Sequence, residues 1–184
     1  MTDIPDPGPR GRRYTIRSLP PYRYVPGRHP HPTRDPRGHS YEPKPKLNRH
    51  GPWQPEDWRH LEDWLYGIDL FNAFYFWEAH EAWEGLWAAA ERESAPALLL
   101  QGLIQIAAAL LKAHMGVDAG AFLLSREGIE KLRHAAAEQP RLMGLDVKRI
   151  AEVFADYFGC SEASGLPIPS RVPLLQLESE DVEE

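Results

Sequence analysis

The distribution of proline divides this chain into two parts that cannot share one kind of structure. Of the 18 prolines, 12 lie in the first 52 residues. Each proline removes a backbone N–H donor and keeps the preceding residue out of the helical region, so neither a helix nor a central strand can run through this segment. All six tryptophans lie between Trp53 and Trp87, where prolines are rare. The folded core is therefore expected after residue 52.

Charge follows the same division. Residues 1–52 carry a net charge of +7 and the remaining residues one of −13, within a total of −6. The basic segment should be attracted to the acidic one, although salt screens this attraction over about 8–10 Å. We expect residues 1–18 to form a disordered basic tail. Residues 19–52, in which tyrosines and Val25 recur, are expected to form an irregular arm that packs on the body.

Hydrophobic periodicity after residue 52 predicts an all-α fold, a compact bundle of about five helices. Pro55, Glu56 and Asp57 are typical of a helix start, because proline suits the first turn and acidic groups favour the positive end of the helix dipole. A helical domain is expected over 53–160, followed by an extended strap and an acidic tail over 161–184. No alternating strand pattern is present. The predicted helices span 55–66, 68–91, 96–115, 118–137 and 146–158, with breaks at Gly67, Gly116 and Gly159.

Cysteine content and hydropathy indicate the compartment. The single cysteine, Cys160, excludes an internal disulfide framework and a cysteine-based zinc finger, and it suits a reducing environment. We interpret it as a packing residue. The first residues lack the apolar stretch of a signal peptide, and the longest apolar run, 98–111, is shorter than a bilayer requires. A cytoplasmic protein without membrane association is expected.

The segment 68–91 carries the candidate site. Its aromatic and aliphatic residues cover nearly the whole helix circumference, which is typical of a buried helix. Four ionisable residues interrupt it, and burial of charge costs several kcal/mol per ion unless the group is paired, protonated or metal-bound. We expect His80, Glu81 and Glu84 to be mostly buried against a polar stripe on the next helix. The four are Glu78, His80, Glu81 and Glu84, and the supporting polar residues are Asn72, Gln101, Gln105 and Lys112.

Three interpretations of this cluster remain open. It can be a structural network in which Lys112 and the glutamines neutralise the carboxylates. It can be a divalent metal site with His80, Glu84 and Glu78 as ligands, because imidazole and carboxylates one helical turn apart are a common ligand arrangement. It can also be an acid/base site with Glu81 and Glu84 as catalytic groups. The string HEAWE lacks the second histidine of the zinc-protease motif, and Trp77 replaces the glutamate of di-iron bundles.

The arm contributes three further candidate ligands, His29, His31 and His39. Loop histidines are usually solvated, but three within eleven residues can also fold over the helical cluster as a lid and complete a metal shell. The sequence contains no glycine-rich phosphate loop, nucleophile elbow or Ser/His/Asp arrangement.

Two segments resemble the family called domain of unknown function 309: FNAFYFWEAHEAWEGLW at 71–87 and LLLQGLIQIAAALLKAHMGVDAGAFLL at 98–124. The resemblance covers about residues 65–135, and the arm looks like the extension of longer members. Ala73 stands where glycine is common and Asp118 where asparagine is common. The resemblance implies a small all-helical bundle with a family pattern that includes His80, Glu81, Glu84, Gln101 and Gln105. It implies no reaction.

These observations give an expectation for function without a reaction or a substrate. The first hypothesis is a His/Glu site that is metal-dependent and hydrolase-like. The second is a non-catalytic interaction or assembly module, whose tryptophan-rich surface binds a partner or a second copy of the chain. Nucleic-acid binding through the basic arm is the weakest hypothesis, because the acidic body repels phosphate.

Overall fold

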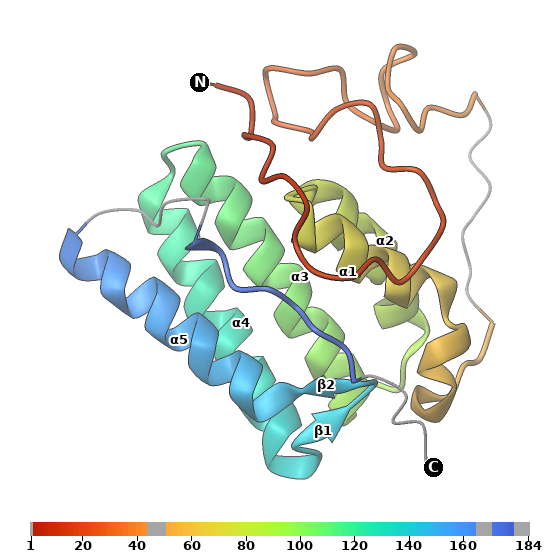
Figure 1. Ribbon diagram of the computed structural model, residues 1–184, viewed down its shortest axis with the longest axis vertical. Coiled ribbons are helices and arrows are strands. Elements are labelled where there is room, and N and C mark those ends of the chain that lie inside the picture. Colours follow the sequence, from red (N-terminus) through yellow and green to blue (C-terminus); the bar gives the residue numbers. More distant parts are fainter. Residues whose placement is uncertain (1, 44–50, 165–170, 179–184) are drawn as a thin grey trace.

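The computed structural model describes residues 2–43, 51–164 and 171–178, and it is mostly helical, as the sequence predicted. Consecutive helices pack against one another, and the arm and the C-terminal segment lie across them (Figure 1). The order of elements is η1 (Pro55–His60), α1 (Glu62–Asn72), α2 (Phe76–Ala89), α3 (Ala95–His114), α4 (Asp118–Glu138), β1 (Arg141–Leu142), β2 (Leu145–Asp146) and α5 (Val147–Ser164).

The break between the first two predicted helices was placed wrongly. Gly67 lies inside α1, where a Cβ atom would come 2.0 Å from the indole nitrogen of buried Trp83. The glycine therefore allows α2 to pack closely on α1 and does not end a helix. The chain turns instead around Phe74, which has a positive φ of 66°. A positive φ is uncommon for residues other than glycine, so a turn at a phenylalanine is difficult to predict from the sequence.

The C-terminal half differs from the prediction in two places. Helix α5 continues through Gly159, the expected stop, to Ser164. The antiparallel pair β1–β2 was missed, because two-residue strands are too short to show an alternating pattern. Its turn has positive φ at both Met143 and Gly144, the arrangement that suits a two-residue hairpin.

The first residues of the chain differ from the expected disordered tail. The backbone N–H groups of Tyr14 and Thr15 donate to the carboxylate of Asp69 at 2.8 and 2.9 Å. The side chain of Asp69 is fully buried, and Arg13 lies 3.1 Å from it. A buried carboxylate thus gives this basic, proline-rich segment a defined place on α1. These bonds between Asp69 and residues 13–15 could not be predicted from composition.

Residues 19–43 also lie on the helices, so we refer to residues 2–43 together as the arm from here on. Val25 is buried, and the backbone N–H of Tyr24 donates to Glu78 on α2 at 2.9 Å. At the other end of the chain, the amide of Asn72 exchanges two hydrogen bonds with the backbone of Leu175, at 2.8 and 2.9 Å. The arm and the segment 171–178 are therefore both attached to α1 or α2. The acidic end of the chain, 179–184, lies outside the described residues.

Helix α3 is long and apolar enough to cross a bilayer by length and composition. In its most apolar stretch, however, 61% of the residues are buried inside the protein. Such burial is typical of the central helix of a water-soluble bundle.

Candidate functional site

His80, Glu81 and Glu84 come together on one face of α2. One ligand atom from each side chain can be chosen so that all three lie within 4.8 Å of one another. His80 Nδ1 lies 3.8 Å from Glu81 Oε1, and His80 Nε2 lies 4.0 Å from Glu84 Oε2. The fold holds this face in place because Ala79, Trp83 and Leu86, at helical spacing, bury the opposite face in the core.

The cluster is more exposed than the sequence predicted. The side chains of His80, Glu81 and Glu84 are 28%, 37% and 52% exposed. The expectation that they are mostly buried against the next helix is therefore wrong for the two glutamates. Although α2 is apolar around most of its circumference, the arm rather than another helix covers part of this face, and the cluster stays open to solvent.

The surroundings shift the pKa values of Glu81 and His80 toward their neutral forms. Partial burial, together with the nearby Glu84 carboxylate, raises the pKa of Glu81 to about 7. Burial also lowers the pKa of His80, and Glu84 opposes this shift only in part. A carboxyl group that titrates near neutral pH beside a neutral imidazole can exchange protons or can bind a cation.

Glu78 belongs to a different set of contacts. It is buried, and its Oε1 lies 3.1 Å from His39 Nε2 and accepts from the backbone of Tyr24. The other ring nitrogen of His39 lies 2.8 Å from the hydroxyl of Ser40. The predicted ligands Glu78 and His39 thus meet each other, one turn before the His80 cluster.

The other two arm histidines do not join the cluster. His29 stacks on Tyr22, and its Nε2 lies 2.9 Å from Asp3. His31 packs edge-on against Trp77, with ring centroids 5.4 Å apart. His29 thus contacts other residues of the arm, and His31 contacts Trp77 of α2. Among the described residues, neither histidine contacts the His80 cluster, so their role as further metal ligands stays a prediction.

The predicted supporting stripe on α3 faces elsewhere. Gln105 donates to Glu127 on α4 at 2.9 Å, and its Oε1 is buried without a hydrogen-bond partner. Gln101 is half-buried, and Lys112 is exposed without an ion pair to any described carboxylate. Asn72 holds the C-terminal segment. No hydrogen bond or ion pair between described residues joins these side chains to the cluster on α2, and the two with hydrogen-bond partners, Gln105 and Asn72, bond to α4 and to the C-terminal segment.

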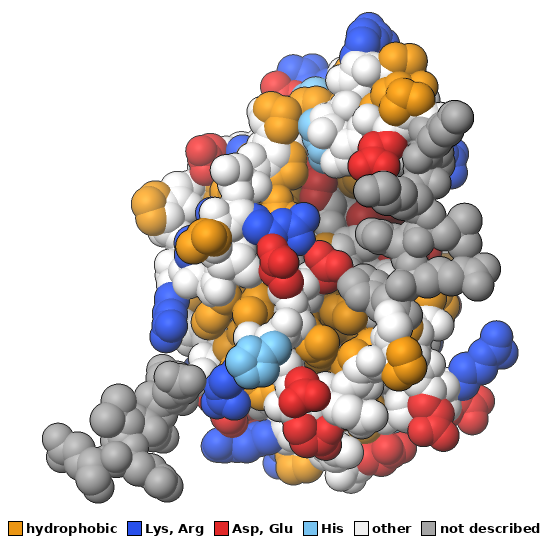
Figure 2. Space-filling model, turned by 90° about the vertical axis from the view of Figure 1, so that its right-hand side faces the viewer, with side chains coloured by type: hydrophobic (Ala, Val, Ile, Leu, Met, Phe, Trp, Pro, Cys, Tyr) orange, Lys and Arg blue, Asp and Glu red, His pale blue; other side chains and the backbone are white. Residues whose placement is uncertain are grey.

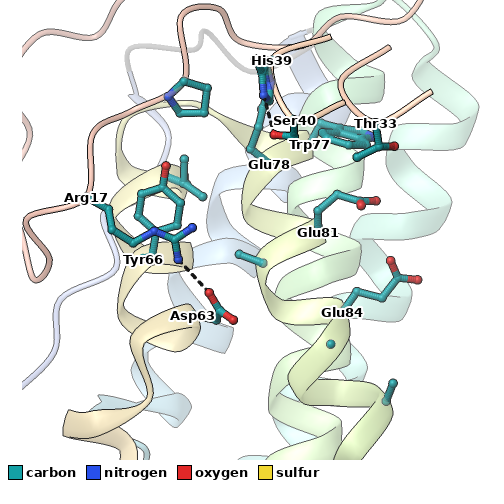
Figure 3. A pocket seen from close by; sticks show the side chains of 15 residues that line it. Arg17, Thr33, His39, Ser40, Asp63, Tyr66, Trp77, Glu78, Glu81 and Glu84 are labelled. Carbon is teal, nitrogen blue, oxygen red and sulfur yellow. Dashed lines mark hydrogen bonds and ion pairs between the residues drawn. The ribbon is translucent and has the colours of Figure 1, made fainter. Parts of the chain in front are cut away.

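A pocket of about 520 Å³ lies between α1, α2 and the arm, and Glu81 and Glu84 of the cluster line it, whereas His80 does not. Figure 3 shows Glu78, Glu81 and Glu84 following one another along α2, with Asp63 and Tyr66 on α1 and Arg17 from the arm. Acidic side chains are also visible in a recess below the arm in Figure 2. Arg17 pairs with Asp63 at 2.8 Å, so these two charges balance.

Sequence reasoning missed Asp69, the most strongly bonded carboxylate of the described residues around this pocket and arm. It accepts from Tyr14, from both the N–H and the hydroxyl of Thr15, and pairs with Arg13. One signal was present: Asp69 is a lone acid within the otherwise apolar run YGIDLF. A buried carboxylate needs partners, and here the basic arm supplies them.

The donor set of the cluster fits a divalent cation. One imidazole and two carboxylates are ligands that zinc, manganese and iron accept. Three donors from one helix would occupy one side of the ion and leave the other side open toward solvent, the arrangement of catalytic rather than structural sites.

Comparison with known proteins places the central helices in a family. Residues 64–124 match the family model described as Domain of unknown function (DUF309). The match covers α1 from Trp64, α2, α3 and the start of α4, and thus contains the whole His80 cluster. No curated protein matches the sequence. As the motifs of the sequence predicted, residues 64–124 belong to the domain of unknown function 309 family.

Proposed function

We propose that His80, Glu81 and Glu84 bind one divalent metal ion and that the protein is a metal-dependent, hydrolase-like enzyme of the cytoplasm. The observation that carries the proposal is the convergence of three ligand atoms within 4.8 Å, two of them on glutamates that line a pocket. Exposed acidic groups often gather without an ion, but the imidazole of His80 adds a donor that a solvated acidic face does not need.

The chemistry of the proposed site follows from its open side. A divalent cation lowers the pKa of a bound water and polarises a carbonyl or phosphoryl oxygen. The water oxygen would bond to the acyl or phosphoryl centre while the bond to the leaving group breaks. His80, Glu81 and Glu84 would each hold the ion with one atom, and the carboxylate oxygen of Glu81 that does not bind the ion would accept the proton from water and return it to the leaving group.

Thermal melting of metal-free protein tests the metal site. With Zn²⁺, Mn²⁺ or Fe²⁺ at about 100 times the dissociation constant, one-site binding stabilises the folded state by about 2.7 kcal/mol. For a chain of this length we expect the melting temperature to rise by about 5–10 °C. Glu84→Gln and His80→Ala should lose this rise.

Glu130→Gln is the matched control, because Glu130 is an exposed carboxylate on α4, outside the cluster. It should respond to metal like the wild type. No metal response in the wild type, together with clear destabilisation of Glu84→Gln, would instead support the alternative, a non-catalytic helical module in which the cluster is a structural network.

A further inference from the structure

Glu78 has an unused hydrogen-bonding atom. Its side chain is only 5% exposed and lines the pocket between α1, α2 and the arm. Both of its donors, the Tyr24 backbone and the His39 ring, meet the same oxygen, Oε1. The second oxygen, Oε2, is buried and has no hydrogen-bond partner. A buried carboxylate oxygen without a donor is costly, and an ordered water or a ligand can supply the missing donor.

The charges around this pocket favour a cationic ligand. The acidic and basic side chains that line it are Arg17, His39, Asp63, Glu78, Glu81 and Glu84. Arg17 is paired with Asp63, and His39 meets Glu78. Neither Glu81 nor Glu84 has a lysine or arginine within ion-pair distance among the described residues. Even with the charge of Arg34, which also acts on Glu81, carboxylates exceed cations among the described residues around the pocket, so an anionic ligand would be repelled.

The remaining walls suit a short alkyl chain that carries this cation. Pro20, Leu70 and Ala82 provide apolar surface beside the carboxylates. Trp77 lies next to Glu78 (Figure 3), and aromatic faces attract ammonium groups. The ring of Tyr66 already binds a cation in this way, since the guanidinium of Arg17 lies 3.9 Å from its centroid.

We propose that this pocket binds a primary alkylammonium group, with the ammonium at Glu78 and the alkyl chain on Pro20, Leu70 and Ala82. The substrate of the neighbouring cluster then carries an amino group at one end and the bond to be hydrolysed toward Glu81 and Glu84. Only this second statement rests on the proposed function. Ammonium binding at Glu78 requires no metal.

The binding is measured by ¹⁵N–¹H NMR titration of metal-free, full-length protein with n-hexylammonium chloride, and with n-hexanol as the uncharged analogue. The backbone N–H signal of Tyr24 should shift, because this group donates to Glu78. Hexanol should bind at least about tenfold more weakly, since hydrogen bonds to a charged group are stronger than neutral ones. Glu78→Gln should weaken hexylammonium binding by a similar factor, whereas Glu130→Gln should not.

Each other outcome overturns the proposal. Equal binding of hexanol would show an apolar cavity only, and unchanged binding in Glu78→Gln would place the ammonium elsewhere. Absence of any shift in the wild type would mean that Glu78 accepts no ligand donor. The wild-type signals decide the question even if Glu78→Gln loosens the arm.

A second measurement separates this inference from the proposed function. Metal-loaded protein should hydrolyse the 4-nitrophenyl ester of 6-aminohexanoic acid at least about tenfold faster, by kcat/KM, than that of hexanoic acid. In this reaction water adds to the acyl carbon, and 4-nitrophenol leaves. Ammonium binding without hydrolysis of either ester would refute the hydrolase and leave the ammonium site standing. Hydrolysis at equal rates would refute the substrate class alone.

Discussion

At the scale of single residues, Glu81 is the group whose protonation most affects the cluster. Its pKa is raised to about 7 from an ordinary value of 4.5, mainly because partial burial disfavours the charge and Glu84 adds repulsion. The folded protein therefore binds a proton more tightly than the unfolded chain between these two values. Consequently, this group makes the free energy of unfolding decrease as pH rises from about 4.5 to about 7.

Replacing Glu81 by glutamine should remove this cost. We expect metal-free Glu81→Gln to be more stable than the wild type at pH 8 by about 1 kcal/mol, a figure reduced because solvent screens a side chain that is 37% exposed. The difference should vanish near pH 4, where both side chains are neutral. Urea unfolding at both pH values measures this, with Glu130→Gln as the control. A variant that is markedly less stable at pH 8 would identify Glu81 as part of a structural network.

The composition of the cluster could be predicted from the sequence, but its surroundings could not. The spacing of His80, Glu81 and Glu84 on a helix is enough to bring them together. The exposure of these three side chains depends on the segment that covers α2. This segment is the irregular arm, and its sequence has no hydrophobic periodicity from which its position could be predicted. The hydrogen-bond partners of Glu78 and Gln105 come from the arm and from α4. The sequence could not predict them, because they depend on how these segments pack.

At the scale of elements, the close packing of α1 on α2 depends on Gly67. A Cβ atom at this position would lie 2.0 Å from Nε1 of Trp83, whose ring is fully buried and donates to the carbonyl of Trp64. We expect Gly67→Ala to lower the free energy of unfolding by about 3 kcal/mol, because the indole has no free space to move into. Chemical denaturation measures the change.

Gly159→Ala is the matched control for this helix substitution. Gly159 lies in α5 with nothing within 4 Å of its would-be Cβ, so alanine should be neutral or stabilise by up to about 1 kcal/mol. Equal stability of Gly67→Ala and the wild type would contradict the packing of α1 on α2. The same two glycines were wrongly predicted to break helices. A sequence shows where a glycine stands, but it does not show whether that glycine ends a helix or allows a neighbouring side chain to pack closely.

At the scale of the whole molecule, Asp69 attaches the first part of the arm to the helical body. Asp69→Asn removes the charge that faces Arg13 and replaces one acceptor oxygen by a donor nitrogen opposite N–H groups. We expect a loss of about 2–3 kcal/mol in stability. Hydrogen exchange should become faster at Tyr14 and Thr15. Hydrogen-exchange mass spectrometry measures this, with Asp156→Asn, on the exposed side of α5, as the control.

Protection of the arm in the wild type provides a further test. If residues 19–41 pack on the acidic helices as described, their amides with buried partners, such as Tyr24, should exchange slowly at low salt. Protection should weaken at high salt, because part of the attraction between arm and body is screened. Fast exchange throughout this segment at low salt would show that the arm is solvated and does not pack on the helices.

The central claim is that His80, Glu81 and Glu84 hold a metal ion, and anomalous X-ray diffraction from crystals soaked in Mn²⁺ or Zn²⁺ tests it most directly. The account predicts an anomalous peak about 2.0–2.2 Å from a ring nitrogen of His80 and from a carboxylate oxygen of Glu84. Glu84→Gln crystals should lose this peak. Crystals that bind the ion only elsewhere, or not at all at the His80 cluster, would contradict the claim.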